Sequence, residues 1–393
     1  MKRKKFFLAL LILLAIGLLV TAHTKPVFSA PELPKEMITT ALPMPSFGYT
    51  FCLAMGDAIQ QRVGVKVRVV TGGSDLARIL PLRTKEAHFS AIVGHSAFYL
   101  SHGWYDYSAE EWGPQPIRCV WAGADFTAMV CRGDAGIKTM ADLKGKRIVD
   151  VAGNVSFNAT NRGFLAFGGL TEADVKIVIA PSSTAAWGHV IEGTGDSFNI
   201  TPAAPKAKEL EASRHGIYWI PTPKANVEGW KRLWEWCPFY TPDIPKVGGG
   251  ISKDNPPELA AFPYLVVAYS SLPVEYAYAW TKGVWEGRNL WGDKHPAFKF
   301  YWTNDICTNY KMLSYPYHDG TVKFIKEIGV WTPAMEKRQQ KQVRLEAARL
   351  AAWGEAKKEA ADKRIKVGTP EFGEFYRKWQ KEHDLISYPV IED

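Results

Sequence analysis

Apolar and polar positions along most of the chain follow the periods of strands and helices. From residue 49 to residue 220, short segments with a strand period are separated by segments with a helical period. Strand and helix in alternation are typical of parallel sheets with helices on both faces. The pattern predicts strands at 65–70, 89–93, 147–151, 175–179 and 197–200 and helices at 51–63, 76–84, 154–168, 182–192 and 205–214.

Capping and breaking residues mark the ends of several of these elements. Thr139 is expected to cap a single helical turn at 140–143, and Thr171 with Asp174 marks a second turn. Ser96 is expected to cap the helix that follows the strand at 89–93. Pro81 is expected to disturb the later half of its helix.

The second half of the chain changes character twice. Residues 221–257 are rich in Pro, Gly and Trp, which favours an irregular crossover before a strand at 265–269 and a helix at 274–286. Residues 333–366 are rich in Ala, Lys, Arg, Glu and Gln, which predicts a long helix, and a second helix is expected at 371–383. A narrow apolar stripe would pack the long helix on the body or on a partner, and it consists of Leu345, Ala348, Ala352, Ala356 and Ala360.

The N-terminus has the pattern of an export signal. Four basic residues at 2–5 precede fifteen apolar residues at 6–20, a run that is short for a membrane span but suits a signal peptide. Small residues offer a cleavage point after Ala22 or after Ala30. We expect a signal peptide at 1–30 and a periplasmic location. An uncleaved anchor is the alternative, and it too would leave the folded part outside the cytoplasm.

Export changes how the net charge is interpreted. The formal net charge is +8, but removal of residues 1–30 leaves 43 basic and 40 acidic residues. A nearly balanced charge gives little support for a nucleic-acid partner. The remaining length of about 360 residues exceeds what one hydrophobic core usually supports, which favours two lobes.

Sequence motifs for catalysis and metal binding are absent. The chain has no phosphate-binding loop, no Gly-x-Ser-x-Gly elbow and no His-Glu-x-x-His zinc motif, so we expect no enzyme activity, no cofactor and no metal. Five Cys residues are too few and too widely spaced for a disulfide scaffold. Cys119 and Cys131 could form one bridge or could be buried free thiols.

Seven short segments, in a fixed order, carry a resemblance to a known family. They are Gly48-Tyr49, Thr-Gly-Gly-Ser at 71–74, Glu-Ala-His-Phe at 86–89, Asp-Leu-Lys-Gly-Lys-Arg-Ile at 142–148, Gly-Leu-Thr at 169–171, His-Asp-Gly at 318–320 and Lys-Glu-Ile-Gly at 326–329. Together they cover roughly residues 40–332. In this order and spacing the chain resembles the TAXI family of TRAP-transporter solute-binding proteins.

The resemblance implies a type II periplasmic-binding-protein fold, an α/β architecture of two Rossmann-like lobes joined by a crossover hinge. Lobe 1 would comprise 31–123 together with 254–332, lobe 2 would comprise 124–253, and 333–393 would be a C-terminal helical extension. A small organic anion, either an amino acid or an oxo- or dicarboxylate, would bind between the lobes and pass to a TRAP membrane permease. We expect a monomer. A periplasmic sensor that acts on a membrane signalling partner is the alternative.

Candidate ligand-binding residues lie where strands meet helix N-termini, because free backbone N–H groups and the helix dipole favour a carboxylate there. Ser, Thr and Asn would add donors, although each also fits a plain helix cap. His95 could donate to an anion or could be a structural histidine. The candidates are Tyr49, Thr50, Ser74, His95, Ser96, Asn154, Ser156, Asn158 and Thr201.

An arginine would pair best with a carboxylate, because its planar fork can bind both oxygens. Arg78, Arg132 and Arg162 are possible partners, and the sequence does not distinguish among them. Val93 and His95 stand where the family usually has Gln and Asp, so the identity of the ligand stays open.

Overall fold

The computed structural model describes residues 33–44, 46–308 and 310–389, with the side chains at 155–156, 306–307 and 310 excepted. The expected signal peptide and both expected cleavage points lie outside these residues. In the described part of the chain, no helix combines the length and the apolar character that crossing a membrane requires. The body begins at Pro34.

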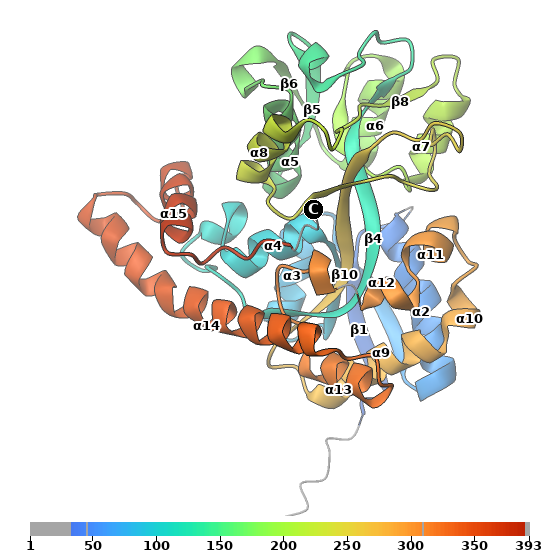
Figure 1. Cartoon of the computed structure of the whole chain (residues 1–393), viewed down its shortest axis with the longest axis vertical. Coiled ribbons are helices and arrows are strands. Elements are labelled where there is room, and N and C mark those ends of the chain that lie inside the picture. Colours follow the sequence, from blue (N-terminus) through green and yellow to red (C-terminus); the bar gives the residue numbers. More distant parts are fainter. Residues whose placement is uncertain (1–32, 45, 309, 390–393) are drawn as a thin grey trace, which may run out of the picture. The chain divides into compact units, whose positions relative to one another are not determined.

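Three parallel strands and the helices after them form the first lobe (Figure 1). β1 pairs with β2 on one side and with β3 on the other. Ser46 and Ser74 cap α2 and α3 by accepting hydrogen bonds from backbone N–H groups of the first turn. The bounds are β1 Glu36–Ala41, α2 Phe47–Val63, β2 Lys66–Thr71, α3 Asp75–Arg83, β3 Phe89–Val93, α4 Gly94–His102 and the 3₁₀ turn η1 Tyr105–Ser108.

Two local expectations in this lobe are wrong. α3 runs unbroken through Pro81 to Arg83, because the fixed φ of proline fits a helix; Pro81 only lacks the N–H that would reach the Ala77 carbonyl one turn earlier. α4 begins at Gly94 after Val93 and has no side-chain cap, so Ser96 is the third residue of the helix and not its cap.

Two long antiparallel strands, β4 (Ile117–Arg132) and β10 (Leu259–Tyr269), connect the lobes. Most of β4 pairs with β10, whose other side pairs with β3, while the last residues of β4 pair with β7 and β8. The expected parallel pairing therefore holds within each lobe but not at the connection. β4 and the first half of β10 were not predicted, because both are buried almost throughout and lack the alternation of a half-exposed strand.

The second lobe follows the predicted αβ alternation closely. β5 pairs in parallel with β6, and a bridge from Ile148 to Ser197 extends this pairing toward β7. Thr139 and Thr171 form capping boxes, as their turns required, and Ser182 caps α6. The bounds are η2 Met140–Leu143, β5 Arg147–Val151, α5 Val155–Phe167, η3 Glu172–Asp174, β6 Lys176–Ala180, α6 Ser183–Glu192, β7 Phe198–Ile200, α7 Pro205–Ala212 and β8 Ile217–Trp219.

The crossover back to the first lobe is more regular than expected. It contains α8 (Val227–Trp236), capped by Asn226, and the short strand β9 (Thr241–Asp243), which pairs with β10. This helix is amphipathic and buries Trp230 and Leu233. It was not predicted, because the many Pro, Gly and Trp residues favoured an irregular segment. After β10 the chain continues as α9 Val274–Glu286, α10 Arg288–Trp291, α11 Pro296–Tyr301, α12 Asn304–Cys307, η4 Tyr310–Met312 and α13 Asp319–Glu327.

The architecture is a two-lobed α/β fold in which two strands cross between the lobes. Figure 1 shows the blue and orange segments in one lobe and the green and yellow segments in the other, with β4 and β10 spanning both. The lobe boundaries at 123/124 and 253/254 stay a prediction.

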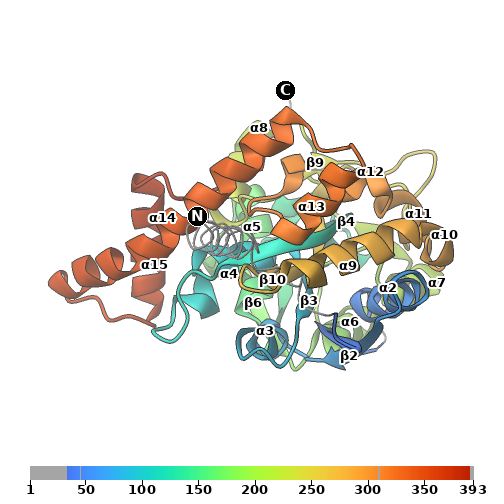
Figure 2. The same cartoon turned by 90° about the horizontal axis from the view of Figure 1, so that it is seen from below.

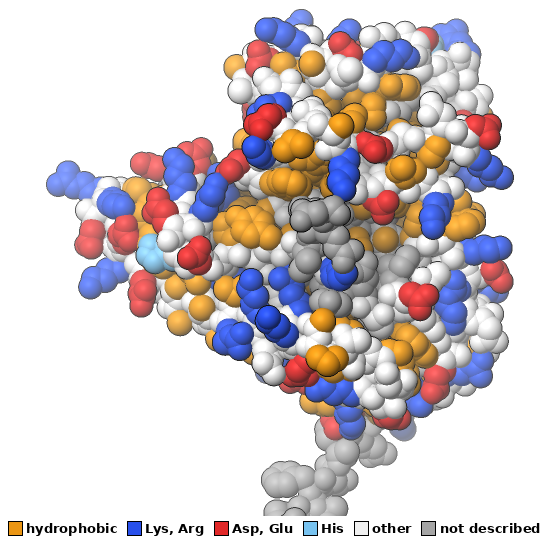
Figure 3. Space-filling view, viewed as in Figure 1, with side chains coloured by type: hydrophobic (Ala, Val, Ile, Leu, Met, Phe, Trp, Pro, Cys, Tyr) orange, Lys and Arg blue, Asp and Glu red, His pale blue; other side chains and the backbone are white. Residues whose placement is uncertain are grey.

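The C-terminal extension consists of α14 (Pro333–Asp362) and α15 (Pro370–Glu382). Figures 1 and 2 show α14 lying along the first lobe beside α13 and α4, with α15 at its far end. The predicted apolar stripe is right for its last three alanines and wrong for Leu345 and Ala348, which are only half-buried. The part of α14 up to Arg349 instead buries polar side chains, among them Gln342 and Arg349 itself. On its outer face, Lys and Arg side chains gather (Figure 3).

Cys119 and Cys131 do not form a bridge. They lie twelve positions apart on the same extended strand, and both are buried free thiols, as are Cys52 and Cys237. A strand rises about 3.3 Å per residue, so the two sulfur atoms are far beyond bonding distance.

Candidate functional site

The carboxyl ends of β1, β2 and β3 lead into the N-termini of α2, α3 and α4. These three helix starts lie side by side because β1 pairs with both β2 and β3. In α/β sheets this edge is where ligands bind. Tyr49 and Thr50 lie in the first turn of α2, half-buried and exposed respectively, and Thr50 donates its hydroxyl to the Ser46 carbonyl. Ser74 accepts from the backbone N–H of Ala77 as the cap of α3.

The Ser96 side chain is hydrogen-bonded to a buried ion pair within lobe 1. Its hydroxyl donates to Asp75, which also pairs with the guanidinium of Arg78 one turn further along α3. All three side chains are buried. Because Asp75 is held by Ser96 as well as by Arg78, the contact fixes the orientation of the guanidinium.

Arg78 is distinct among the three arginines that the sequence left open. Arg162 binds Asp150 through two nitrogens and also binds Glu172, and Arg132 pairs with Asp134. Arg78 is 2% exposed and uses one nitrogen for Asp75, while its Nε and Nη1 have no acceptor among the described residues. Two buried donors without acceptors are costly, so they are a natural position for an anionic group.

His95 lies next to this pair, with its ring buried. It is 8% exposed, its ring lies near Tyr99, Phe239 and Phe262, and its Nδ1 has no partner among the described residues. Burial lowers the pKa of His95 to about 4, with Asp75 opposing and Arg78 adding to the shift. A neutral imidazole can hydrogen-bond a ligand without adding charge.

Asp125 is a buried acid on β4 where the two lobes meet, and it was not among the residues predicted from the sequence. The Thr201 hydroxyl donates to its Oδ1 at 2.7 Å, as does the Phe126 backbone N–H at 2.8 Å, while Oδ2 has no donor among the described residues. Burial raises the pKa of Asp125 to about 7, against these two hydrogen bonds. A lone acid in the apolar run 117–132 was the available signal. The predicted residue Thr201 is thus hydrogen-bonded to Asp125 on β4, and its contact with a ligand stays a prediction.

The predicted residues at the start of α5 mainly stabilise their own junction. Asn154 caps the helix by accepting from the Phe157 N–H. Asn158 both accepts from and donates to the backbone of Val151 at the end of β5. The side chain of Ser156 lies outside the described part. Whether these residues contact a ligand remains a prediction.

An aromatic wall covers the start of α2. Tyr264 on β10 lies within 6 Å of the rings of Phe47, Phe51 and Trp302. A Cβ on Gly48 would lie 2.2 Å from the Tyr264 hydroxyl oxygen, so only glycine allows this approach. Among the described residues, no group of three or more His, Cys, Asp or Glu side chains could hold a metal ion.

Gly48→Ala is expected to destabilise the protein by about 1–3 kcal/mol, because the new methyl group displaces the Tyr264 hydroxyl in a packed wall. Tyr264→Phe removes that oxygen, so the same alanine should cost clearly less in the Tyr264→Phe background. Urea unfolding of the two single variants and the double variant measures this coupling. Strictly additive effects on the free energy of unfolding would show that the contact with the Tyr264 hydroxyl does not cause the loss of stability in Gly48→Ala.

Acidification is expected to destabilise the fold between pH 6.5 and 4. Burial lowers the pKa of His95 and of His318 to about 4 and that of His102 well below 6.5, so in this range the unfolded chain takes up protons at these histidines that the folded chain does not. Asp125 acts in the opposite direction, because its folded pKa is raised to about 7. Each net proton that the unfolded chain takes up corresponds to about 1.4 kcal/mol per pH unit. The midpoint of unfolding should therefore decrease as the pH is lowered. The decrease per pH unit should be smaller in His95→Gln than in a His189→Gln control, and equal decreases in the two variants would contradict this.

The chain thus combines a two-lobed α/β fold with buried polar groups where the lobes meet. It belongs to the NMT1-like family, whose model matches residues 46–329.

Among solved structures, the chain is similar to several binding proteins. It shares 12% identity with the GluR0 ligand-binding core from Nostoc punctiforme in complex with L-glutamate, over 67% of this chain and 100% of that one, with a TM-score of 0.39. It shares 12% with a putative periplasmic sulfonate-binding protein from Methylobacillus flagellatus, over 91% and 98%, with a TM-score of 0.41. It shares 14% with the VFT2 domain of BvgS from Bordetella pertussis, over 65% and 90%, with a TM-score of 0.37.

Proposed function

We propose that this protein is an extracytoplasmic solute-binding receptor that captures a small organic anion between its lobes and delivers it to a membrane transporter of the TRAP type. Membership of the NMT1-like family supports the receptor role, and the ordered TAXI-like segments support the TRAP partner. The observation that carries the anion preference is Arg78, with two buried N–H groups that lack an acceptor among the described residues. An amino acid or an oxo- or dicarboxylate fits this chemistry.

Capture follows from the preorganised position of Arg78. Asp75 and Ser96 hold the guanidinium before any ligand arrives, so little side-chain entropy is lost on binding. Helix N-termini add backbone donors at the same edge of the sheet. The lobes would close by bending of β4 and β10 near Asp125, the hinge motion of two-lobed proteins.

Thermal denaturation in the presence of single amino acids, oxoacids and dicarboxylates tests the proposal. A ligand that binds only the folded state stabilises it by RT ln(1 + [L]/Kd), so the melting temperature rises with the logarithm of the ligand concentration once that concentration exceeds Kd. We expect at least one small carboxylate to raise it by several degrees at millimolar concentration. No shift with any of them would argue against a receptor for organic anions.

A periplasmic sensor is the second candidate, and the C-terminal extension favours it. The extension contacts lobe 1 through buried hydrogen bonds and α8 through an ion pair between Lys381 and Glu235. A sensor could transmit lobe movement through this element to a partner. Removal of 334–393 should then abolish signalling but preserve ligand affinity, whereas a transport receptor should keep uptake.

A further inference from the structure

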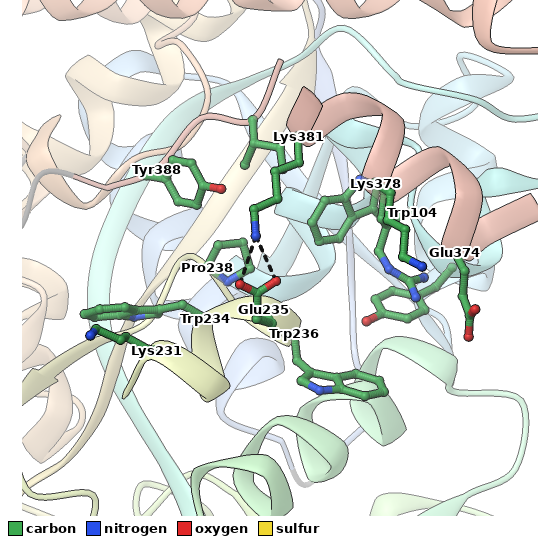
Figure 4. A pocket seen from close by; sticks show the side chains of 13 residues that line it. Trp104, Lys231, Trp234, Glu235, Trp236, Pro238, Glu374, Lys378, Lys381 and Tyr388 are labelled. Carbon is green, nitrogen blue, oxygen red and sulfur yellow. Dashed lines mark hydrogen bonds and ion pairs between the residues drawn. The ribbon is translucent and has the colours of Figure 1, made fainter. Parts of the chain in front are cut away.

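A cavity lies between α8, η1 and the C-terminal extension (Figure 4). Its volume is about 590 Å³, within the range of small-molecule sites. It shares no lining residue with the cluster around Arg78 and His95. One wall is formed by α15 and the segment after it, which lie beyond the residues 46–329 that the family model matches.

The lining of this cavity is aromatic and carries more cations than acids. Lys231, Arg377, Lys378 and Lys381 face two acids, Glu235 and Glu374. The ion pair of Lys381 with Glu235 joins α15 to α8 and occupies one of each charge (Figure 4). The aromatic residues are Trp104, Tyr105, Trp234, Trp236 and Tyr388.

Tyr105 provides an independent sign that the cavity is built to hold a ligand. Its hydroxyl is buried and has no partner among the described residues. The backbone of Tyr105 has φ of 54°, a left-handed conformation that is unfavourable for a tyrosine and is retained here. Arg377 lies over its ring at 4.9 Å, which places a guanidinium beside the hydroxyl-bearing ring in the cavity wall.

We propose that this cavity is a second binding site, for a small aromatic carboxylate. The ring would stack on the tryptophans, and the carboxylate would bind Lys378 and Arg377, the cations of α15 that have no carboxylate partner among the described residues. The Tyr105 hydroxyl would donate to the ligand. A neutral aromatic compound would lack the ionic part of this recognition, and an aliphatic acid would lack the stacking.

The position of the cavity links it to lobe movement, if the lobes close as proposed above. α15 is fixed to lobe 1, because Gln380 donates to the His102 carbonyl and accepts from the Trp104 indole. α8 is fixed to lobe 2, because Arg232 donates to the Ala166 and Phe167 carbonyls at the end of α5. A ligand between them would favour one lobe arrangement and change affinity at the other site.

Isothermal titration of the full secreted chain with phenylacetate and with indole-3-acetate, each beside its neutral amide, tests the site. We expect saturable binding of at least one acid, at least tenfold tighter than its amide. Arg377→Gln with Lys378→Gln should weaken it at least tenfold and Tyr105→Phe several-fold. Lys358→Gln on the exposed face of α14 is the matched control and should leave it unchanged.

Arg78→Lys separates the two sites. The α15 variant is the one that carries Arg377→Gln and Lys378→Gln. If the aromatic acid still binds to Arg78→Lys but no longer binds to the α15 variant, the result supports the second site, whatever ligand the interlobe site takes. Loss in Arg78→Lys together with retention in the α15 variant would place the aromatic acid between the lobes and overturn the proposal. Failure of both acids to bind, or equal affinity for acid and amide, would also overturn it.

Discussion

Replacing Arg78 with lysine is expected to weaken binding of the proposed organic anion by about 100-fold while the protein stays folded. Lysine keeps a positive charge beside Asp75, but it has no second nitrogen to direct at a carboxylate. Loss of two hydrogen bonds to a charged ligand corresponds to roughly 3 kcal/mol. The measurement is the thermal shift, and then calorimetric affinity, with the best carboxylate from the panel.

A second variant separates binding from folding. Arg78→Gln leaves Asp75 buried without its cation, so it should lose about 3–5 kcal/mol of stability as well as binding. Arg62→Gln, an exposed arginine in the last turn of α2, is the matched control and should change neither. If Arg78→Lys bound the ligand as tightly as the wild type, Arg78 would be a structural residue only.

Replacing Arg349 with methionine is expected to detach the C-terminal extension and to cost about 3–4 kcal/mol. Arg349 is 1% exposed and donates to the carbonyl of Ser101 on α4 and to that of Leu385 after α15. Methionine fills much of the volume but leaves both carbonyls without this donor. Burial lowers the pKa of Arg349 to about 10, against Glu346, so the side chain stays charged at neutral pH and the two carbonyls solvate that charge.

Urea unfolding and limited proteolysis measure the two parts of this effect. Arg349→Met should unfold at lower urea and release a C-terminal fragment at protease concentrations that leave the wild type intact. Arg344→Met, an exposed arginine five residues earlier on the same helix, controls for the change of charge. Equal protease resistance in the two variants would show that Arg349 does not hold the extension.

Local signals predicted much of the fold. Thr139, Asn154 and Ser182 begin the elements expected of them, because a helix cap is decided by a few neighbouring residues. Strands such as β5 were predicted because a short segment rich in Ile and Val lies between turns that contain Gly145 and Gly153. β4 was missed, because a strand buried on both faces has no period to detect, and α8 was missed under its many tryptophans.

The candidate site depended on contacts between distant segments, which the sequence does not display. Ser96 was expected as a cap, but its partner Asp75 lies 21 residues earlier on another helix. The fold pairs Arg162 with Asp150 and Glu172, and these pairs distinguish it from Arg78. Asp125 is recognised as a candidate from its hydrogen bond with Thr201, which lies 76 residues away in the sequence. The buried polar face of α14 likewise needs partners on α4 and in the tail.

Native mass spectrometry of the protein purified from its host tests the central claim most directly. A receptor for an organic anion is expected to show a mass adduct that dissociates as a small carboxylic acid, and Arg78→Lys should lose the adduct while Arg62→Gln keeps it. An adduct that is neutral or cationic, or one that is retained in full by folded Arg78→Lys, would contradict the account.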